Sequence, residues 1–92
     1  MHMEKTEFER NLSELLITIE RLLVAKNRKY GNSALEPKRI FSKASPIEQI
    51  LVRIDDKLSR LSNQTIDEDE DVVTDLIGYL LILKMAQNAA VK

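Results

Sequence analysis

The chain has 92 residues, a net charge of −1 and no cysteine, with 43% hydrophobic and 32% charged residues. This size allows one small domain with a modest core, and the near-neutral charge gives no broad basic surface for duplex nucleic acid or an anionic membrane. Disulfides and thiolate chemistry are excluded, and two glycines and two prolines are too few for the turns of an all-β fold.

The first predicted helix runs from about Thr6 to about Asn27, after Met1–Met3, which have the form of a cloning-site remnant and receive no function. Thr6 and Glu9 have capping-box spacing, and Gly31 is expected to stop the helix in a left-handed conformation. Its apolar residues recur at helical intervals and form one stripe. They are Phe8, Leu12, Leu15, Leu16, Ile19, Leu22 and Leu23.

Residues 30–44 are expected to be mainly loop because Pro37 and the lack of periodicity oppose a regular element, although a turn of helix fits around residues 38–41. The basic residues before this loop have a structural explanation, since cations are favourable at a helix C-terminus. That explanation does not cover Tyr30-Gly-Asn-Ser as a unit. Tyr30 is suited to stack on a base, and Asn32 or Ser33 to read its edge or hold a phosphate.

The second predicted helix begins at Ser45 as the cap, with Pro46 in the first turn and Glu48 completing a capping box. Its buried stripe is expected to comprise Ile47, Ile50, Leu51, Ile54, Leu58 and Leu61. Its polar face carries Arg53, Asp56, Lys57 and Arg60. One interpretation is a solvated face with ion pairs, and the other is a phosphate clamp of cations beside a carboxylate that binds metal.

The third predicted helix runs from about Asp67 to about Ala89, after a short link at residues 62–65 that predicts antiparallel neighbours. It is apolar on almost every side between Leu76 and Leu83, which predicts a homodimer or higher homo-oligomer with this helix at the centre. The apolar run is too short to span a bilayer, so we expect a soluble cytoplasmic protein with no membrane partner.

Asp71 and Asp75 lie four residues apart, so an uninterrupted helix would place them on one face, and Asp75 borders the apolar segment. Together with Asp56 they form a candidate Mg²⁺ site with catalytic function. The acidic run of residues 67–70 has a structural explanation, because the helix dipole favours negative charge there. Tyr79 is one turn beyond Asp75 on the same face. It is interpreted either as a structural hydrogen-bond partner of Asp75 or as part of the site.

The order of three segments resembles the nucleotide modification associated domain family of phages and mobile elements, itself similar to the MazG-type all-α nucleoside triphosphate pyrophosphatases. The segments are the basic stretch ending in Tyr30-Gly-Asn-Ser, then Arg53-Ile-Asp-Asp-Lys-Leu-Ser-Arg-Leu, then Glu70-Asp-x-x-x-Asp-Leu-x-x-Tyr. The resemblance implies a MazG-like helical fold with a magnesium-dependent site that cleaves a nucleoside triphosphate to monophosphate and pyrophosphate.

The resemblance also implies roles for individual residues. Asp71 and Asp75 match the acidic pair of the last segment, and Asp56 matches the aspartate before Lys57. Lys57 and Arg60 match the basic residues of the second segment, and Lys29, Tyr30 and Gly31 match the loop motif. With the residues singled out by their chemistry, the positions expected to bind substrate are Lys29, Tyr30, Asn32, Arg53, Lys57 and Arg60, together with Tyr79. One position departs from the pattern, because Arg53 stands where the related pyrophosphatases carry a metal-binding glutamate. This departure bears on hydrolysis more than on nucleotide binding.

The sequence thus predicts a single all-α domain over residues 1–92, a small antiparallel helical bundle completed by homo-oligomerisation. The predicted function is that of a magnesium-dependent nucleoside triphosphate pyrophosphohydrolase or a nucleotide-binding relative. The alternative is a non-catalytic helical interaction module that uses the same apolar third helix for assembly.

Overall fold

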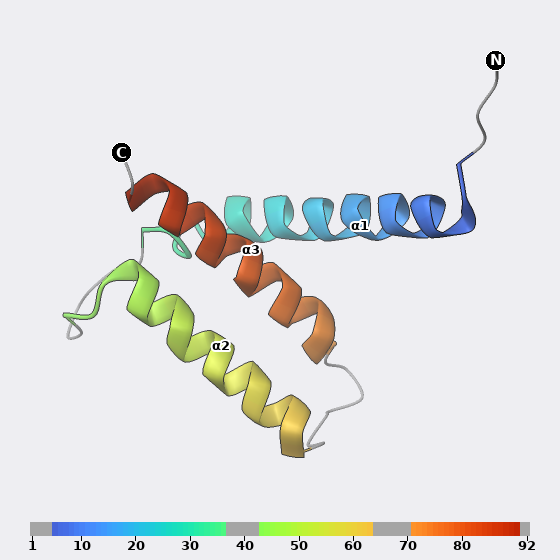
Figure 1. Ribbon diagram of the computed structural model, residues 1–92. Coiled ribbons are helices and arrows are strands. Elements are labelled where there is room, and N and C mark those ends of the chain that lie inside the picture. The colour runs from blue at the N-terminus through green and yellow to red at the C-terminus, as the bar shows by residue number, and fades with distance from the viewer. Residues whose placement is uncertain (1–4, 37–42, 64–70, 91–92) are drawn as a thin grey trace.

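The computed structural model describes residues 5–36, 43–63 and 71–90, and over these ranges the chain forms three helices and no strand (Figure 1). The helices are α1 (Glu7–Lys29), α2 (Pro46–Asn63) and α3 (Val72–Ala90). The predicted all-α fold class is therefore confirmed. The short helical turn predicted around residues 38–41 lies outside the described residues.

Helix α1 begins and ends with the local contacts that its sequence predicts. The Thr6 hydroxyl accepts a hydrogen bond from the Glu9 backbone N–H at 3.1 Å, which satisfies one of the unpaired donors of the first turn. At the other end Gly31 has a φ of 61°, and the Asn32 N–H donates to the Asn27 carbonyl at 3.1 Å. This pairing is that of a left-handed helix stop at Gly31.

Helix α2 begins with a reciprocal capping box. The Glu48 N–H donates to Ser45 Oγ at 3.1 Å, and the Ser45 N–H donates to Glu48 Oε2 at 3.4 Å. Pro46 occupies the first helical position, where its missing N–H leaves no hydrogen bond unmade. The predicted start is confirmed, and the helix continues to Asn63, through two residues that were expected to belong to the following link.

Helix α3 begins later than its sequence pattern predicted. The expected start was about Asp67, whereas the helix begins at Val72 and Asp71 stands outside it. The Asp71 side chain accepts a hydrogen bond from the Thr74 N–H, so it caps the helix. Residues 67–70 lie outside the described residues.

Helices α2 and α3 form an antiparallel hairpin that holds the clearest core of the molecule (Figure 1). Ile50 and Ile54 of α2 are buried against Ala86 of α3. Partly buried hydrophobic residues surround these three side chains. They are Leu35, Ile47, Leu76, Tyr79, Ile82 and Leu83. The antiparallel arrangement predicted from the short link is confirmed for this pair.

The stripe predicted to be buried on α2 is only partly covered. Ile50 and Ile54 are buried, but Leu51, Leu58 and Leu61 are 43%, 47% and 39% exposed. The reason is the arrangement of the helices, because α3 contacts both of the others while α1 and α2 have no extensive contact with each other. A single neighbour covers only a narrow strip of α2.

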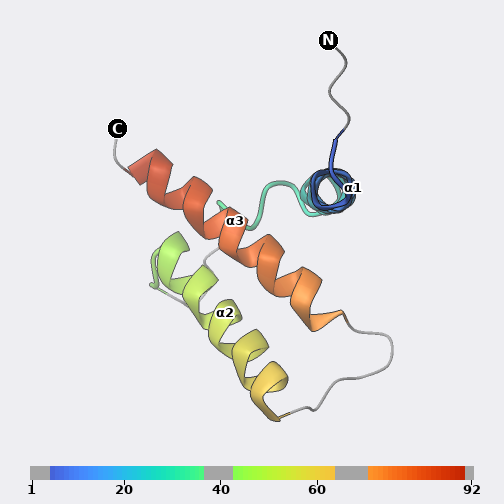
Figure 2. The same ribbon diagram turned by 45° about the vertical axis from the view of Figure 1, so that its right-hand side comes forward.

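Helix α1 crosses the hairpin instead of aligning with it, and Figure 2 views α1 almost end-on while α3 runs obliquely. Ile19 is its one buried residue, and Phe8, Leu15 and Leu16 are 74%, 59% and 53% exposed. The radius of gyration is 16.0 Å, against about 12 Å for a compact domain of this length. The three helices of one chain therefore do not close into a bundle.

Helix α3 keeps an uncovered apolar side although it lies between the two other helices. Ile77, Leu80 and Leu81 are 38%, 48% and 41% exposed, and Val73 is 54% exposed. Over the described residues, no helix is both long enough and apolar enough to cross a membrane.

Candidate functional site

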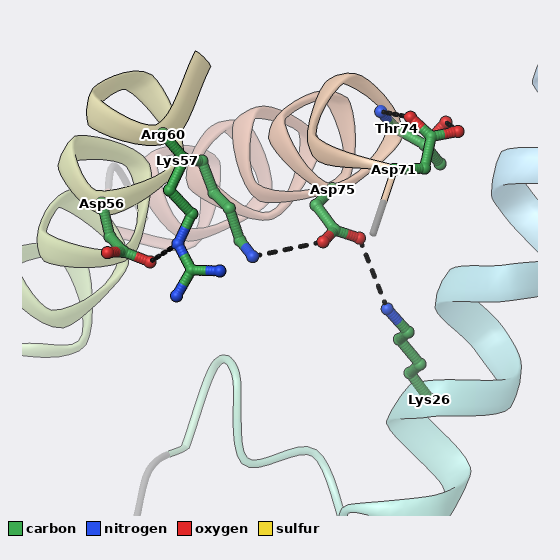
Figure 3. Close-up of polar contacts among 7 residues, drawn as sticks. All are labelled: Lys26, Asp56, Lys57, Arg60, Asp71, Thr74 and Asp75. Atoms are coloured by element: carbon green, nitrogen blue, oxygen red, sulfur yellow. Dashed lines mark hydrogen bonds and ion pairs between the residues drawn. The ribbon is translucent and has the colours of Figure 1, made fainter. Parts of the chain in front are cut away.

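Asp75 lies where the three helices meet, and it makes ion pairs with lysines of both other helices (Figure 3). Its Oδ2 is 3.2 Å from Lys57 Nζ of α2, and its Oδ1 is 3.7 Å from Lys26 Nζ of α1. The Asp75 side chain is 23% exposed, so its carboxylate has lost much of its water and depends on these cations. Asp75 therefore links the hairpin to α1.

The two lysines differ in exposure. The Lys57 side chain is 14% exposed and makes the shorter contact, so this pair fastens α2 to α3 in a partly desolvated place. The Lys26 side chain is 52% exposed and its contact is longer. Solvent screens such a pair, so Lys26 gives up little when it turns toward another anion.

Asp71 does not share a helical face with Asp75, because it precedes α3. Its Oδ1 accepts from the Thr74 N–H at 3.0 Å, and its Oδ2 accepts from the Thr74 hydroxyl at 2.6 Å. These hydrogen bonds to the charged carboxylate, the hydroxyl first, lower the pKa of Asp71 below its ordinary value. In Figure 3 Asp71 and Thr74 form their own pair at the start of the helix.

Asp56 belongs to the polar face of α2, where its Oδ2 is 3.3 Å from Arg60 Nε one helical turn later. The two side chains are 54% and 44% exposed, so this contact matches the interpretation of a solvated face with ion pairs. Figure 3 places Asp56 and Arg60 to one side of the contact between Lys57 and Asp75.

The three predicted metal ligands thus have three different environments. Within the described ranges, no group of three or more His, Cys, Asp or Glu side chains is placed to hold a metal ion. Asp56 contacts Arg60, Asp71 caps a helix, and Asp75 is paired with two lysines. Because Asp56 and Asp75 contact cations and Asp71 caps a helix, the arrangement does not fit a magnesium site within one chain, and we derive no chemical step from Mg²⁺. The magnesium role stays a prediction.

A cleft of about 1180 Å³ opens between α1 and α3 and extends to the first half of α2. Five of the residues predicted to form a site line it, and they come from the turn after α1 and from helices α2 and α3. They are Tyr30, Asn32, Arg53, Asp75 and Tyr79. Asp56, Lys57, Arg60 and Asp71 are not among the lining residues, and Lys29 instead places its Nζ 5.4 Å from the centre of the Tyr30 ring.

Tyr79 has a mixed environment. Its side chain packs against the hairpin core as well as lining the cleft. Asp75 has Lys57 and Lys26 as its ion-pair partners, so the pairing of Asp75 with Tyr79 that the sequence left open is not needed to explain its burial. The Tyr79 side chain therefore lies between the hairpin core and the cleft.

The cleft carries more positive charge than the chain as a whole. Among the described residues, four basic and two acidic side chains line it, which gives +2 in a chain whose net charge is −1. The basic residues are Lys26, Arg28, Arg53 and Lys84, and the acidic ones are Glu20 and Asp75. A cleft with an excess of cations in low-dielectric walls concentrates anions.

Lys26 belongs to the basic stretch before Tyr30, but the sequence-based prediction did not pair it with Asp75. The sequence contains one indication that Lys26 faces another helix. Lys26 follows Leu22 by four residues and Ile19 by seven, so it continues the apolar stripe of α1. A lysine at a position that faces another helix is expected to have an anionic partner there. The contact with Asp75 provides that partner.

Comparisons of this chain with protein-family models, with curated proteins and with solved structures find no match.

Proposed function

We propose that the protein binds a phosphorylated nucleotide, a nucleoside triphosphate in the first instance, in the cleft between α1 and α3. The observation that carries the proposal is the charge of +2 among the lining residues of a chain whose net charge is −1. An anionic ligand with an aromatic part suits a cleft that has cations, two tyrosines and apolar walls.

The phosphates are assigned to Lys26 and Arg53. Lys26 is about half exposed and holds Asp75 only at 3.7 Å, so a phosphate oxygen is a competitive partner for its ammonium. Arg53 lines the cleft from α2, and its planar guanidinium suits two phosphate oxygens at once. Lys57 stays with Asp75 and holds the hairpin together, and phosphate roles for Lys57 and Arg60 remain untested predictions.

The base is assigned to Tyr30. Its ring is 59% exposed and borders the cleft, so a flat aromatic ligand has access to it. Asn32 follows at a φ of 62° in the turn after α1, and its amide supplies a donor and an acceptor at the same edge of the cleft. These two residues retain the substrate-binding roles that the sequence predicts.

Magnesium-dependent pyrophosphohydrolysis is the further step of this proposal. Its support is the resemblance of the three sequence segments to MazG-like pyrophosphatases, which also implies a MazG-like fold and a homo-oligomer. Asp56, Asp71 and Asp75 have separate partners, so hydrolysis has less support than binding. The nucleotide-binding relative of such enzymes is therefore the form of the function that we favour.

Calorimetric titration with ATP, GTP, CTP and UTP, each with magnesium and with a chelator, tests the proposal. Lys26→Ala is expected to weaken triphosphate binding roughly 10-fold or more, because a charge-assisted contact is lost. Arg21→Ala is the matched control, since Arg21 is an exposed cation of the same helix outside the cleft lining. It should change the affinity by about twofold at most.

Two results would contradict the proposal. One is a parent protein that binds none of the four triphosphates at about millimolar concentration, the weak end of specific affinity. The other is an equal loss in Lys26→Ala and Arg21→Ala. Pyrophosphate release in the same samples decides the hydrolytic step separately from binding.

The second candidate function is a helical interaction module. The observation that favours it is the uncovered apolar stripe of α1, of which Phe8 is 74% exposed. An interaction module needs such a surface and does not need the positive cleft. A chain that assembles with a partner but binds no triphosphate would favour this function over nucleotide binding.

A further inference from the structure

We infer that the uncovered first half of α1 is the contact surface for a second copy of this chain, with the two α1 helices antiparallel. This inference deepens the assembly part of the proposed function, on which it rests, and it is independent of nucleotide binding. It moves the centre of the predicted oligomer from α3 to α1.

The surface is defined by the first half of the α1 stripe, which we call the α1 arm. It comprises Phe8, Leu12, Leu15 and Leu16, which are 74%, 45%, 59% and 53% exposed. In Figure 1 the first half of α1 projects away from the hairpin, while its second half crosses α3. No described helix of the same chain covers the α1 arm.

The spacing of the stripe suits a helical partner. Phe8, Leu12, Leu15, Ile19 and Leu22 alternate steps of four and three residues, which is the 3.5-residue repeat of helices that pack along their length. Ile19 is already buried within the chain, so the repeat continues outward from an existing contact. A second helix laid on the α1 arm would extend that packing.

The total exposed area of the chain is larger than that of a compact monomer. The chain exposes 7965 Å², against about 5500 Å² for a compact monomer of its mass, an excess of roughly 2500 Å². This excess is spread over the open shape of the whole chain, and the exposed side chains of the α1 arm contribute to it.

The charges at the two ends of α1 favour a second copy and set its direction. The first turn carries Glu7 and Glu9, and the last turn carries Lys26, Arg28 and Lys29. Antiparallel helices bring the acidic end of each toward the basic end of the other, whereas parallel helices would bring like charges together. A two-fold axis across α1 produces the antiparallel pairing with identical contacts from both copies.

The uncovered side of α3 borders the same region. Val73, Ile77, Leu80 and Leu81 are exposed on the helix that α1 crosses. The α1 helix of a partner bound on the arm would come to lie beside this side of α3.

The test compares the parent protein with a double variant of the arm, Leu12→Arg with Leu15→Arg, by light scattering and sedimentation. The parent is expected to have about twice the monomer mass of 10.6 kDa. The arm variant should dissociate at concentrations roughly 100-fold higher or more, because the interface would bury unpaired charges. Its far-UV circular dichroism should stay helical, since both positions are exposed in the single chain.

Val52→Arg with Leu58→Arg is the matched control. Both residues are exposed apolar positions, 65% and 47%, on α2 away from the arm, and this variant should keep the parent mass. A parent that stays at 10.6 kDa would overturn assembly altogether. A parent dimer that the arm variant leaves intact would overturn the α1 surface alone, and triphosphate titration reports on the cleft in either case.

Cysteine crosslinking tests the contact surface directly, because the chain has no cysteine of its own. Leu15→Cys lies near the middle of the stripe, so the two copies should form a disulfide across an antiparallel pair. Val52→Cys should not crosslink under the same oxidation. Crosslinking of Val52→Cys without Leu15→Cys would show that the copies meet through α2 and would contradict the inference.

Discussion

Helices α2 and α1 both have a regular apolar stripe in the sequence, yet α2 buries part of its stripe in the hairpin whereas α1 leaves most of its stripe exposed. Ile50 and Ile54 are 4% and 7% exposed in the hairpin, whereas Phe8 and Leu15 of α1 are 74% and 59% exposed. The difference shows that amphipathic periodicity predicts a helix with an apolar face, but it does not predict which element covers that face. Helix α3, which follows α2 in the sequence, covers part of the α2 stripe, whereas no described helix covers the first half of the α1 stripe.

Removing a buried side chain of the hairpin should have the largest effect on stability. Ile54→Ala is expected to lower the free energy of unfolding by about 2–4 kcal/mol, because it leaves a cavity beside Ile50 and Ala86. Val52→Ala on the exposed side of the same helix should change it by about 0.5 kcal/mol at most. Urea unfolding followed by circular dichroism measures both, and equal losses would mean that the hairpin has no distinct core.

Separating α1 from the hairpin should have an intermediate effect. A Cβ atom at Gly78 would come within 3.0 Å of Leu23 Cδ2, so Gly78→Leu is expected to push α1 away and cost about 1–3 kcal/mol. Gly78→Ala is the control, since Leu23 can rotate aside and alanine favours the helix by about 1 kcal/mol.

Spin labels on cysteines at Asn11 and Gln87, both exposed, report the distance between α1 and α3 in these variants. Gly78→Leu should broaden and lengthen the distance distribution, and Gly78→Ala should leave it close to that of the labelled parent. An unchanged distribution in Gly78→Leu would mean that Gly78 does not set the approach of the two helices.

The ion pairs of Asp75 and Asp56 should differ in their effect on stability, and both effects should be smaller than those above. Asp75→Asn should cost about 1–2 kcal/mol, because Lys57 would be left partly desolvated beside a neutral group. Asp56→Asn removes an exposed pair with Arg60 and should cost about 0.5 kcal/mol at most. Thermal unfolding at low and high salt checks this, and a cost for Asp56→Asn that equals the cost for Asp75→Asn would contradict the ranking.

The helix cap at Asp71 should have the smallest effect, and that effect should depend on pH. Its hydrogen bonds from Thr74 lower its pKa below 3.8, so the charged cap stabilises the fold above that pH. The stabilisation is lost as the pH falls through the lowered pKa. The difference in melting temperature between the parent and Asp71→Ala should thus be full at pH 7 and shrink in strong acid.

Asp71→Asn is the control for this pH dependence, since it keeps an acceptor for the Thr74 N–H without a titrating charge. It should lose less than Asp71→Ala at pH 7. A difference between the parent and Asp71→Ala that grows as the pH falls would contradict the assignment of Asp71 as a charged cap.

The candidate site was predictable to the extent that its residues lie near one another in the sequence. Tyr30 and Asn32 were singled out as a unit and both line the cleft. Asp75 was identified by its place at the edge of an apolar segment, but its partners Lys57 and Lys26 come from two other helices. Helical spacing paired Asp75 with Asp71, but the Asp71 carboxylate caps α3 on Thr74 while the Asp75 carboxylate contacts the two lysines.

The sequence by itself determined the all-α class, the starts of α1 and α2 and the stop at Gly31. These features depend on contacts between residues at most five positions apart, such as Ser45 with Glu48 and Asn27 with Asn32. Tertiary structure alone decided which apolar stripe is covered and which cations meet Asp75. Those outcomes depend on the direction in which α1 leaves the hairpin, and long-range packing across a loop sets that direction.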